Sequence, residues 1–295
     1  MGRYHAAAAS AAARSPRLMG EFQMTESGRN GRPTLLRRVG QRLLVLSEPY
    51  LYVERTDTDG DPTVPRGLHA LGLRVNQAVI ERGKTPPWIL TDEQCRAFWA
   101  SRVPGGPDND PVDMARKDPS VMDFLHSFWQ PEVGFEDEIL ELGPNAGGNF
   151  AALRKLGYAH LSGVEINTNA LEVFRTEHPE TWEAVKIVEG AFETVLPSLP
   201  ARSYDCVFTA SVGIHIHPAS HRVFAEMARL SRKHVCVLET EAANGRYTFA
   251  RNYKRVFERL GCTQIRELHV DPSSVPNIQR QYDGYVARLF RVGDR

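Results

Sequence analysis

The feature that most constrains the fold is an apolar run that ends in a glycine-rich turn near the middle of the chain. Residues 139–142 read Ile-Leu-Glu-Leu, and glycines follow at Gly143, Gly147 and Gly148. A short apolar run bounded by glycines is typical of a strand buried on both faces of a parallel sheet. Glycines after such a strand let the backbone approach a ligand closely. We therefore expect a ligand site at this turn.

A helical pattern and a second strand follow the turn. The helical pattern ends at Gly157, and its apolar face is formed by Phe150, Leu153 and Leu156. Residues 161–164 form the next apolar run, which presents Glu165 at its carboxyl end, about twenty residues past the turn. In a β-α-β unit, an acid at this position can accept hydrogen bonds from ribose hydroxyl groups. The pattern therefore predicts a nucleotide-binding unit.

The order of residues in the turn argues against a dinucleotide ligand. A dinucleotide fingerprint requires Gly-x-Gly-x-x-Gly, in which the second glycine lets the backbone meet the pyrophosphate. Gly143 and Gly148 fit the first and third positions, but Asn145 occupies the second. Glu141 would repel a pyrophosphate, whereas it would attract the ammonium group of an amino acid.

The pattern Glu-x-Gly-x-Asn-x-Gly over residues 141–147 resembles the first motif of class I S-adenosylmethionine (SAM) dependent methyltransferases. The string Glu-Leu-Gly-Pro-Asn-Ala-Gly-Gly-Asn-Phe is most similar to bacterial methylases associated with sugar and secondary-metabolite clusters. The resemblance implies SAM as the cofactor, with its methionine part in the turn, its ribose at Glu165 and its adenine at the loop after the third strand. In that loop Ala191-Phe192 stands where many members carry an acid or an amide. The implied cofactor-binding residues are Glu141, Gly143, Pro144, Asn145, Gly147, Asn149, Glu165, Ile166, Ala191, Phe192 and Ser211.

Later apolar runs complete a sheet. Further strands are predicted at residues 185–188, 204–209, 234–238, 263–270 and 284–292. Two closing strands after five β-α units resemble the layout of the methyltransferase sheet. We expect an α/β fold: a Rossmann-like, doubly wound, mostly parallel seven-stranded sheet with an N-terminal helical lid region.

Three segments are expected along the chain. Residues 1–33, rich in Ala and Arg at their start, are expected to be a disordered tail. Residues 34–130 read as a helical lid and substrate region, in which Thr91 to Gln94 has the form of a capping box. Residues 131–295 read as the SAM-binding domain.

The helical region is rich in aromatic residues. As the walls of an acceptor pocket we predict Trp88, Trp99, Phe124, Phe128 and Trp129. The alternative is that these rings simply attach the helices to the sheet, and for any single ring this is the more common role.

The loop after the fourth strand carries the candidate catalytic residues, His215 and His217. A histidine at this end of the sheet could deprotonate an amine or hydroxyl acceptor. The alternative is that its ring only caps the following helix. A metal site is not predicted, because the sequence reveals no third ligand for the two histidines. Glu239 and Glu241, after the fifth strand, either hold a cationic acceptor or lie solvated, and the sequence leaves both open.

Composition narrows the class of partner. The 295 residues include 36 basic and 36 acidic residues, and no stretch gathers the basic surface that a nucleic-acid backbone requires. The four cysteines are scattered without Cys-x-x-Cys spacing, as expected of reduced thiols in a cytoplasmic protein. No apolar run approaches the length of a membrane span. We expect a small-molecule substrate and neither a nucleic-acid nor a membrane partner, while the oligomeric state stays open.

The predicted activity is SAM-dependent methyl transfer to a nitrogen or oxygen atom of a small molecule, in secondary metabolism. Two alternatives remain at this point. One is a SAM-consuming cyclase that makes azetidine-2-carboxylate and releases methylthioadenosine. The other is a non-catalytic SAM-binding protein, which the intact set of Gly143, Gly147 and Glu165 argues against.

Overall fold

The computed structural model describes residues 78–80, 84–85, 90–106, 109–241 and 247–293. The tail expected over residues 1–33 lies outside the described residues. So do most of the expected helical region before residue 90 and the predicted pocket residue Trp88.

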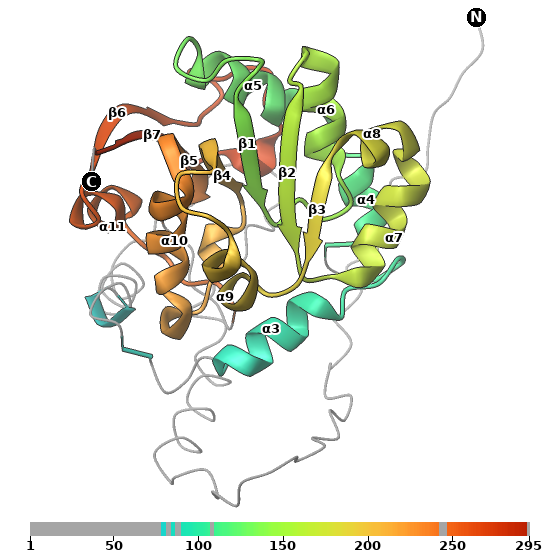
Figure 1. Cartoon of the computed structure of the whole chain (residues 1–295), viewed down its shortest axis with the longest axis horizontal. Helices are drawn as coiled ribbons and strands as arrows, with labels where there is room; N and C mark the ends of the chain where they lie inside the picture. The colour runs from blue at the N-terminus through green and yellow to red at the C-terminus, as the bar shows by residue number, and fades with distance from the viewer. Residues whose placement is uncertain (1–77, 81–83, 86–89, 107–108, 242–246, 294–295) are drawn as a thin grey trace, which may run out of the picture.

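Seven strands form one sheet in the order β3-β2-β1-β4-β5-β7-β6 (Figure 1). The first five are parallel, and β7 runs antiparallel to both β5 and β6. Their bounds are β1 Glu138–Leu142, β2 His160–Glu165, β3 Lys186–Glu189, β4 Tyr204–Ala210, β5 Ser231–Thr240, β6 Cys262–His269 and β7 Tyr285–Val292. The predicted mostly parallel seven-stranded sheet is confirmed.

Helices cover both faces of the sheet (Figure 1). Successive strand residues point to opposite faces, so Ile139 packs into one core and Leu140 into the other. The first core lies under α5 (Ser120–Trp129), α6 (Gly148–Leu156) and α7 (Thr168–Glu177). The second lies under α10 (Arg222–Leu230) and α11 (Tyr253–Arg259).

Helix α3 (Asp92–Ala100) begins as the sequence predicts. The Thr91 hydroxyl accepts the backbone N–H of Gln94, and the Gln94 side chain accepts the N–H of Thr91. These reciprocal bonds form a capping box, which satisfies two amide groups at the start of the helix.

Three short helices were not predicted from sequence: α4 (Pro111–Ala115), α8 (Pro179–Ala184) and α9 (Phe192–Val195). Elements of four to six residues are too short to show a helical repeat of apolar residues. Helix α9 lies in the loop where the adenine was expected.

Helix α5 belongs to the core of the sheet. Phe124, Phe128 and Trp129 are all buried in the first core, and the Trp129 Nε1 donates to the Tyr158 hydroxyl at 2.6 Å. These three rings do not line the cavity described below, which differs from the pocket role expected for them. Their packing is that of the alternative interpretation, in which the aromatic rings attach the helix to the sheet.

Candidate functional site

A cavity lies at the carboxyl ends of β1, β2 and β4. Its wall comes from the turn after β1, the end of β2, the loop before α9, the loop after β4, and one face of α3. The residues that complete it from outside these segments are Arg102, Asn109, Met114, Lys117 and Tyr282. In an open α/β sheet this edge is where ligands bind, because the strand order reverses between neighbouring strands there.

At two positions of the turn after β1, neighbouring side chains leave no room for a Cβ atom, so glycine is required. Gly143 has φ +73°, and a Cβ on it would lie 2.9 Å from the Val212 side chain. Gly147 has φ +76°, and its Cβ would lie 2.2 Å from the Phe174 ring. Gly143 lines the cavity, whereas Gly147 does not. The structure thus places Gly147 in helix packing rather than against a ligand.

Glu141 and Asn149 form a buried acceptor pair beside the cavity. The Asn149 amide donates to Glu141 Oε1, and Asn149 lines the cavity while Glu141 lies behind it. Burial raises the pKa of Glu141 to about 7. Glu141 Oε2 and Asn149 Oδ1 are buried without a hydrogen-bond partner among the described residues. An ammonium group has the three N–H donors and the positive charge that these two acceptor oxygens require.

Glu165 is anchored by three backbone amides. Its Oε1 accepts the N–H groups of Ile166 and Asn167, and its Oε2 accepts that of Asn145, each at 2.8 Å. Asn145, which donates to Glu165, has φ +51°. A carboxylate has about four acceptor positions, so Glu165 keeps room for a hydroxyl group from the cavity. Burial raises the pKa of Glu165 despite these hydrogen bonds.

In Figure 1, α3 crosses the molecule beyond the carboxyl ends of the parallel strands. Contacts near its two ends hold it there, and its residues line the cavity. At its N-terminal end, Ser220 Oγ donates to Asp92 at 2.7 Å. Beyond its C-terminal end, the carbonyl of Arg102 accepts the side-chain amides of Asn167 and Asn169, each at 3.1 Å. Residues from successive turns of α3 therefore face the cavity: Asp92, Cys95, Arg96 and Trp99.

The loop after β4 is held in place by two buried charged residues. Glu239 accepts the backbone N–H groups of residues 212, 213 and 214 at 3.0, 2.8 and 3.1 Å. Arg251, only 1% exposed, donates to the carbonyl groups of Gly213 and Ile216. Glu239 therefore positions the loop, which is neither of the two roles left open by the sequence.

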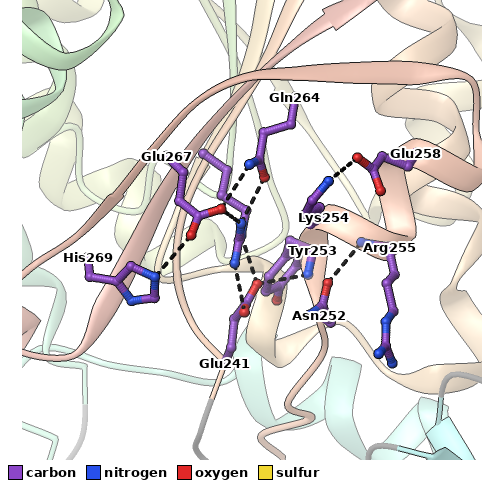
Figure 2. Close-up of polar contacts among 10 residues, drawn as sticks. Glu241, Asn252, Tyr253, Lys254, Arg255, Glu258, Gln264, Glu267 and His269 are labelled. Atoms are coloured by element: carbon purple, nitrogen blue, oxygen red, sulfur yellow. Dashed lines mark hydrogen bonds and ion pairs between the residues drawn. The ribbon is translucent and has the colours of Figure 1, made fainter.

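Glu241 is also engaged away from the cavity. Arg288 donates to both carboxylate oxygens of Glu241 at 3.0 Å and also to Gln264 and Glu267, the side chains that converge in Figure 2. Glu241 accepts the backbone N–H of Tyr253 as well, at 2.9 Å. The network ties β5, β6, β7 and the start of α11 together, so Glu241 holds the sheet edge.

Comparison with known proteins agrees with this geometry. Residues 140–237 match a family model described as a methyltransferase domain. Residues 140–237 are a class I SAM-dependent methyltransferase domain. No curated protein matches the sequence.

Two solved structures share the fold of this methyltransferase. One is a geranyl diphosphate methyltransferase in complex with GPP and sinefungin, with a TM-score of 0.52, 14% identity, and coverage of 68% of this chain and 99% of that one. The other is geranyl diphosphate C-methyltransferase from Streptomyces coelicolor A3(2), in complex with Mg²⁺, geranyl diphosphate and S-adenosyl-L-homocysteine. Its TM-score is 0.51, at 12% identity, over 68% of this chain and 98% of that one.

The methyltransferase cavity fits SAM. The unpartnered acceptors of Glu141 and Asn149 suit the ammonium group of its methionine part, and Glu165 suits a ribose hydroxyl. Of the residues implied as cofactor-binding, these line the cavity: Gly143, Pro144, Asn145, Asn149, Glu165, Ile166, Ala191, Phe192 and Ser211. Arg96 of α3 lines the cavity together with Ala191 and Phe192, pairs with Asp92 and lies 3.5 Å from Glu193.

The two candidate histidines of the methyltransferase differ in what their rings contact. His217 accepts the N–H of Ala219 at Nδ1 and donates from Nε2 to the Leu90 carbonyl, so both nitrogens are engaged with the backbone. His215 donates from Nδ1 to the Tyr247 carbonyl at 2.9 Å, which leaves Nε2 as the unprotonated acceptor. Its ring lies 4.2 Å from that of Trp99, centroid to centroid.

Tyr282 is a site residue that sequence reasoning missed. It is hydrogen-bonded to Ser211, and burial raises the pKa of its hydroxyl to about 12. Ser211 itself has φ +62°, a strained backbone conformation for a residue other than glycine. Tyr282 comes from a short 3-10 helix between β6 and β7, and no local pattern marks it.

Other classes of site are not found in the described part of the methyltransferase. No group of three or more His, Cys, Asp or Glu side chains there is arranged to hold a metal ion. None of the helices within the described ranges is long and apolar enough to cross a membrane.

Proposed function

We propose that this enzyme methylates an oxygen or nitrogen atom of a small molecule held between α3 and the loop after β4, and that His215 accepts the proton. The observation that carries the proposal is the state of the His215 ring. Its Nδ1–H is fixed on the Tyr247 carbonyl, so Nε2 has a lone pair, and the residue lines the cavity. Burial lowers the pKa of His215 to about 4, so its ring is neutral near pH 7 but is a weaker base than an exposed imidazole.

The chain's own residues supply binding, orientation and exclusion of water. Glu141 and Asn149 hold the ammonium end, Glu165 holds the ribose, and α3 covers the cavity. When bound, SAM supplies a methyl group on a sulfonium that is already activated. Holding the acceptor in line with that methyl group accounts for most of the required rate.

Methyl transfer to an oxygen or nitrogen atom releases a proton, and His215 is the proposed acceptor of that proton. The acceptor's O–H or N–H bond breaks as its oxygen or nitrogen bonds to the methyl carbon, and the methyl–sulfur bond breaks with its electrons left on sulfur. The released proton passes to Nε2 of His215. Ser211 and Tyr282, which are hydrogen-bonded to each other, also line the cavity, so two hydroxyl groups have fixed positions in its wall.

We further propose a cytoplasmic enzyme of secondary metabolism. The balanced numbers of acidic and basic residues support a small acceptor rather than a nucleic acid. All four cysteines are buried free thiols, as a reducing compartment allows.

The first test incubates the purified protein with SAM alone and then with a panel of phenols, alcohols and amines, and identifies the nucleoside product by mass. S-adenosylhomocysteine formed only with an acceptor supports the proposal. Methylthioadenosine formed without any acceptor would refute it and indicate internal chemistry on SAM.

Substitutions of the two histidines then test whether His215 accepts the proton. His215→Asn should lower kcat about 100-fold or more while leaving the affinity for S-adenosylhomocysteine within a few-fold. His217→Asn is the matched control and should change stability more than kcat, because both nitrogens of His217 hold backbone groups. An unchanged kcat in His215→Asn would contradict the assignment.

A further inference from the structure

We infer that Lys117 binds the carboxylate of the methionine part of SAM, so that a segment before the matched domain supplies part of the cofactor site. The inference rests on the assignment of SAM to this cavity and does not depend on the identity of the acceptor.

Lys117 is placed beside the turn by a tight contact between α4 and α6. A Cβ on Gly148, the first residue of α6, would lie 2.3 Å from the carbonyl oxygen of Met114 and 3.2 Å from Cγ of Lys117. Only glycine therefore allows this approach. Lys117 is partly buried and lines the cavity together with Gly143 and Asn149.

The backbone before Lys117 is fixed from the other side by α7. Arg116 forms a bidentate pair with Glu177, at 2.9 and 2.8 Å. The ring of His178 donates from Nε2 to the carbonyl of Ala115 at 2.8 Å. These contacts hold the end of α4, so the Lys117 side chain starts from a defined position at the cavity wall.

Among the described residues, Lys117 has no carboxylate in direct contact at this end of the cavity. Glu141 is the carboxylate whose charge acts on Lys117, but the two form no direct ion pair, and Lys117 has no other carboxylate partner within the described ranges. Burial lowers the pKa of Lys117. A half-buried ammonium group without an anion is costly unless a ligand supplies one.

The shape of an amino acid explains why a cation is needed there. Its ammonium nitrogen and carboxylate carbon are separated by one carbon atom, about 2.5 Å apart. With the ammonium on Glu141 and Asn149, the ligand carboxylate lies close to the negative charge of Glu141, which repels it. A positive charge from Lys117 offsets that repulsion and produces two complementary ion pairs.

The other cations that line the cavity are occupied elsewhere. Arg96 pairs with Asp92 and faces Glu193 on the adenine side. Arg102 has its guanidinium 3.8 Å from the ring centre of Phe98, and its carbonyl is anchored at Asn167 near the ribose. Within the described residues, Lys117 is the lining cation beside the methionine end.

The experiment is a cycle of two ligands and two variants, measured by isothermal titration calorimetry. S-adenosylhomocysteine is compared with S-adenosyl-3-thiopropylamine, which keeps the ammonium group and lacks the carboxylate. Lys117→Met should weaken binding of S-adenosylhomocysteine about 30-fold and leave binding of the decarboxylated ligand within about 3-fold. Glu141→Gln should weaken both ligands by similar factors, because both carry the ammonium group.

Two controls separate the possible failures. Lys155→Met, on the exposed side of α6, should leave both affinities unchanged, and urea unfolding shows whether each variant is folded. An equal loss for both ligands in a folded Lys117→Met protein, or no loss for either, would overturn the role of Lys117. If the wild type bound neither ligand, the assignment of SAM to the cavity would itself fail.

Discussion

The raised pKa of Glu141 predicts how cofactor affinity depends on pH. Glu141 has a pKa of about 7 in the unliganded protein, chiefly because it is buried. The ligand ammonium requires the carboxylate form. Affinity for S-adenosylhomocysteine should therefore rise as pH increases toward 7 and level off above it, because protonated Glu141 must first lose its proton.

The size of the effect follows from that pKa. Below pH 7 each pH unit costs about tenfold in affinity, so binding at pH 5 should be about 100-fold weaker than the plateau, or about 2.7 kcal/mol. Near pH 7 about half a proton should be released for each ligand bound. The stability of the unliganded protein depends on pH in the opposite direction. Since the folded pKa lies above the usual 4.5, this group's contribution falls by about 3 kcal/mol as pH rises from 4.5 to 7.

Calorimetry between about pH 5 and 7.5, in buffers with different ionisation enthalpies, measures both the affinity and the proton release. Two neighbouring charges also act on Glu141: the positive charge of Lys117 lowers its pKa, and the negative charge of Glu165 raises it. Glu141→Gln should flatten the profile, whereas Glu138→Gln, at the opposite end of β1, should not. A flat wild-type profile, or an equal slope in Glu141→Gln, would refute the reasoning.

Two further substitutions test the ribose and turn contacts. Glu165→Gln puts an amide donor against an N–H of the turn, so it should weaken S-adenosylhomocysteine binding about tenfold or more and lower the free energy of unfolding by about 2 kcal/mol. Its control, Glu189→Gln at the paired exposed position of β3, should change neither calorimetric affinity nor urea stability. Gly147→Ala should cost about 2–4 kcal/mol in urea unfolding, because its Cβ would meet the Phe174 ring at 2.2 Å. Gly157→Ala, also at positive φ but with 3.7 Å of clearance, should cost only about 1 kcal/mol. Equal costs for the two glycines would contradict the packing argument.

The sequence by itself determined the sheet and the cofactor edge. Apolar runs and glycine turns are local signals, and every predicted strand from residue 139 onward is present. The carboxyl ends of parallel strands share one edge, so residues such as Asn145 and Glu165 could be placed together without tertiary information. The capping box at Thr91 is local too, since its two hydrogen bonds span three residues.

Only the tertiary structure decided which helix meets the ligand. Trp99 on α3 and Trp129 on α5 look alike in sequence, yet Trp99 lines the cavity and Trp129 is buried against Tyr158. An apolar helical face shows that a helix packs, but not on which surface it packs.

The same limit explains two residues that sequence reasoning did not find, Tyr282 and Lys117, and the role that it did not assign to Glu239. Tyr282 reaches Ser211 from the far end of the chain, Glu239 holds the loop after β4, and Lys117 enters beside Gly148 from a segment between two helices. Each contact joins positions that only folding brings together, and no periodic pattern records it. The local chemistry of the chain fixed where SAM binds, while long-range packing selected the groups that close the site around it.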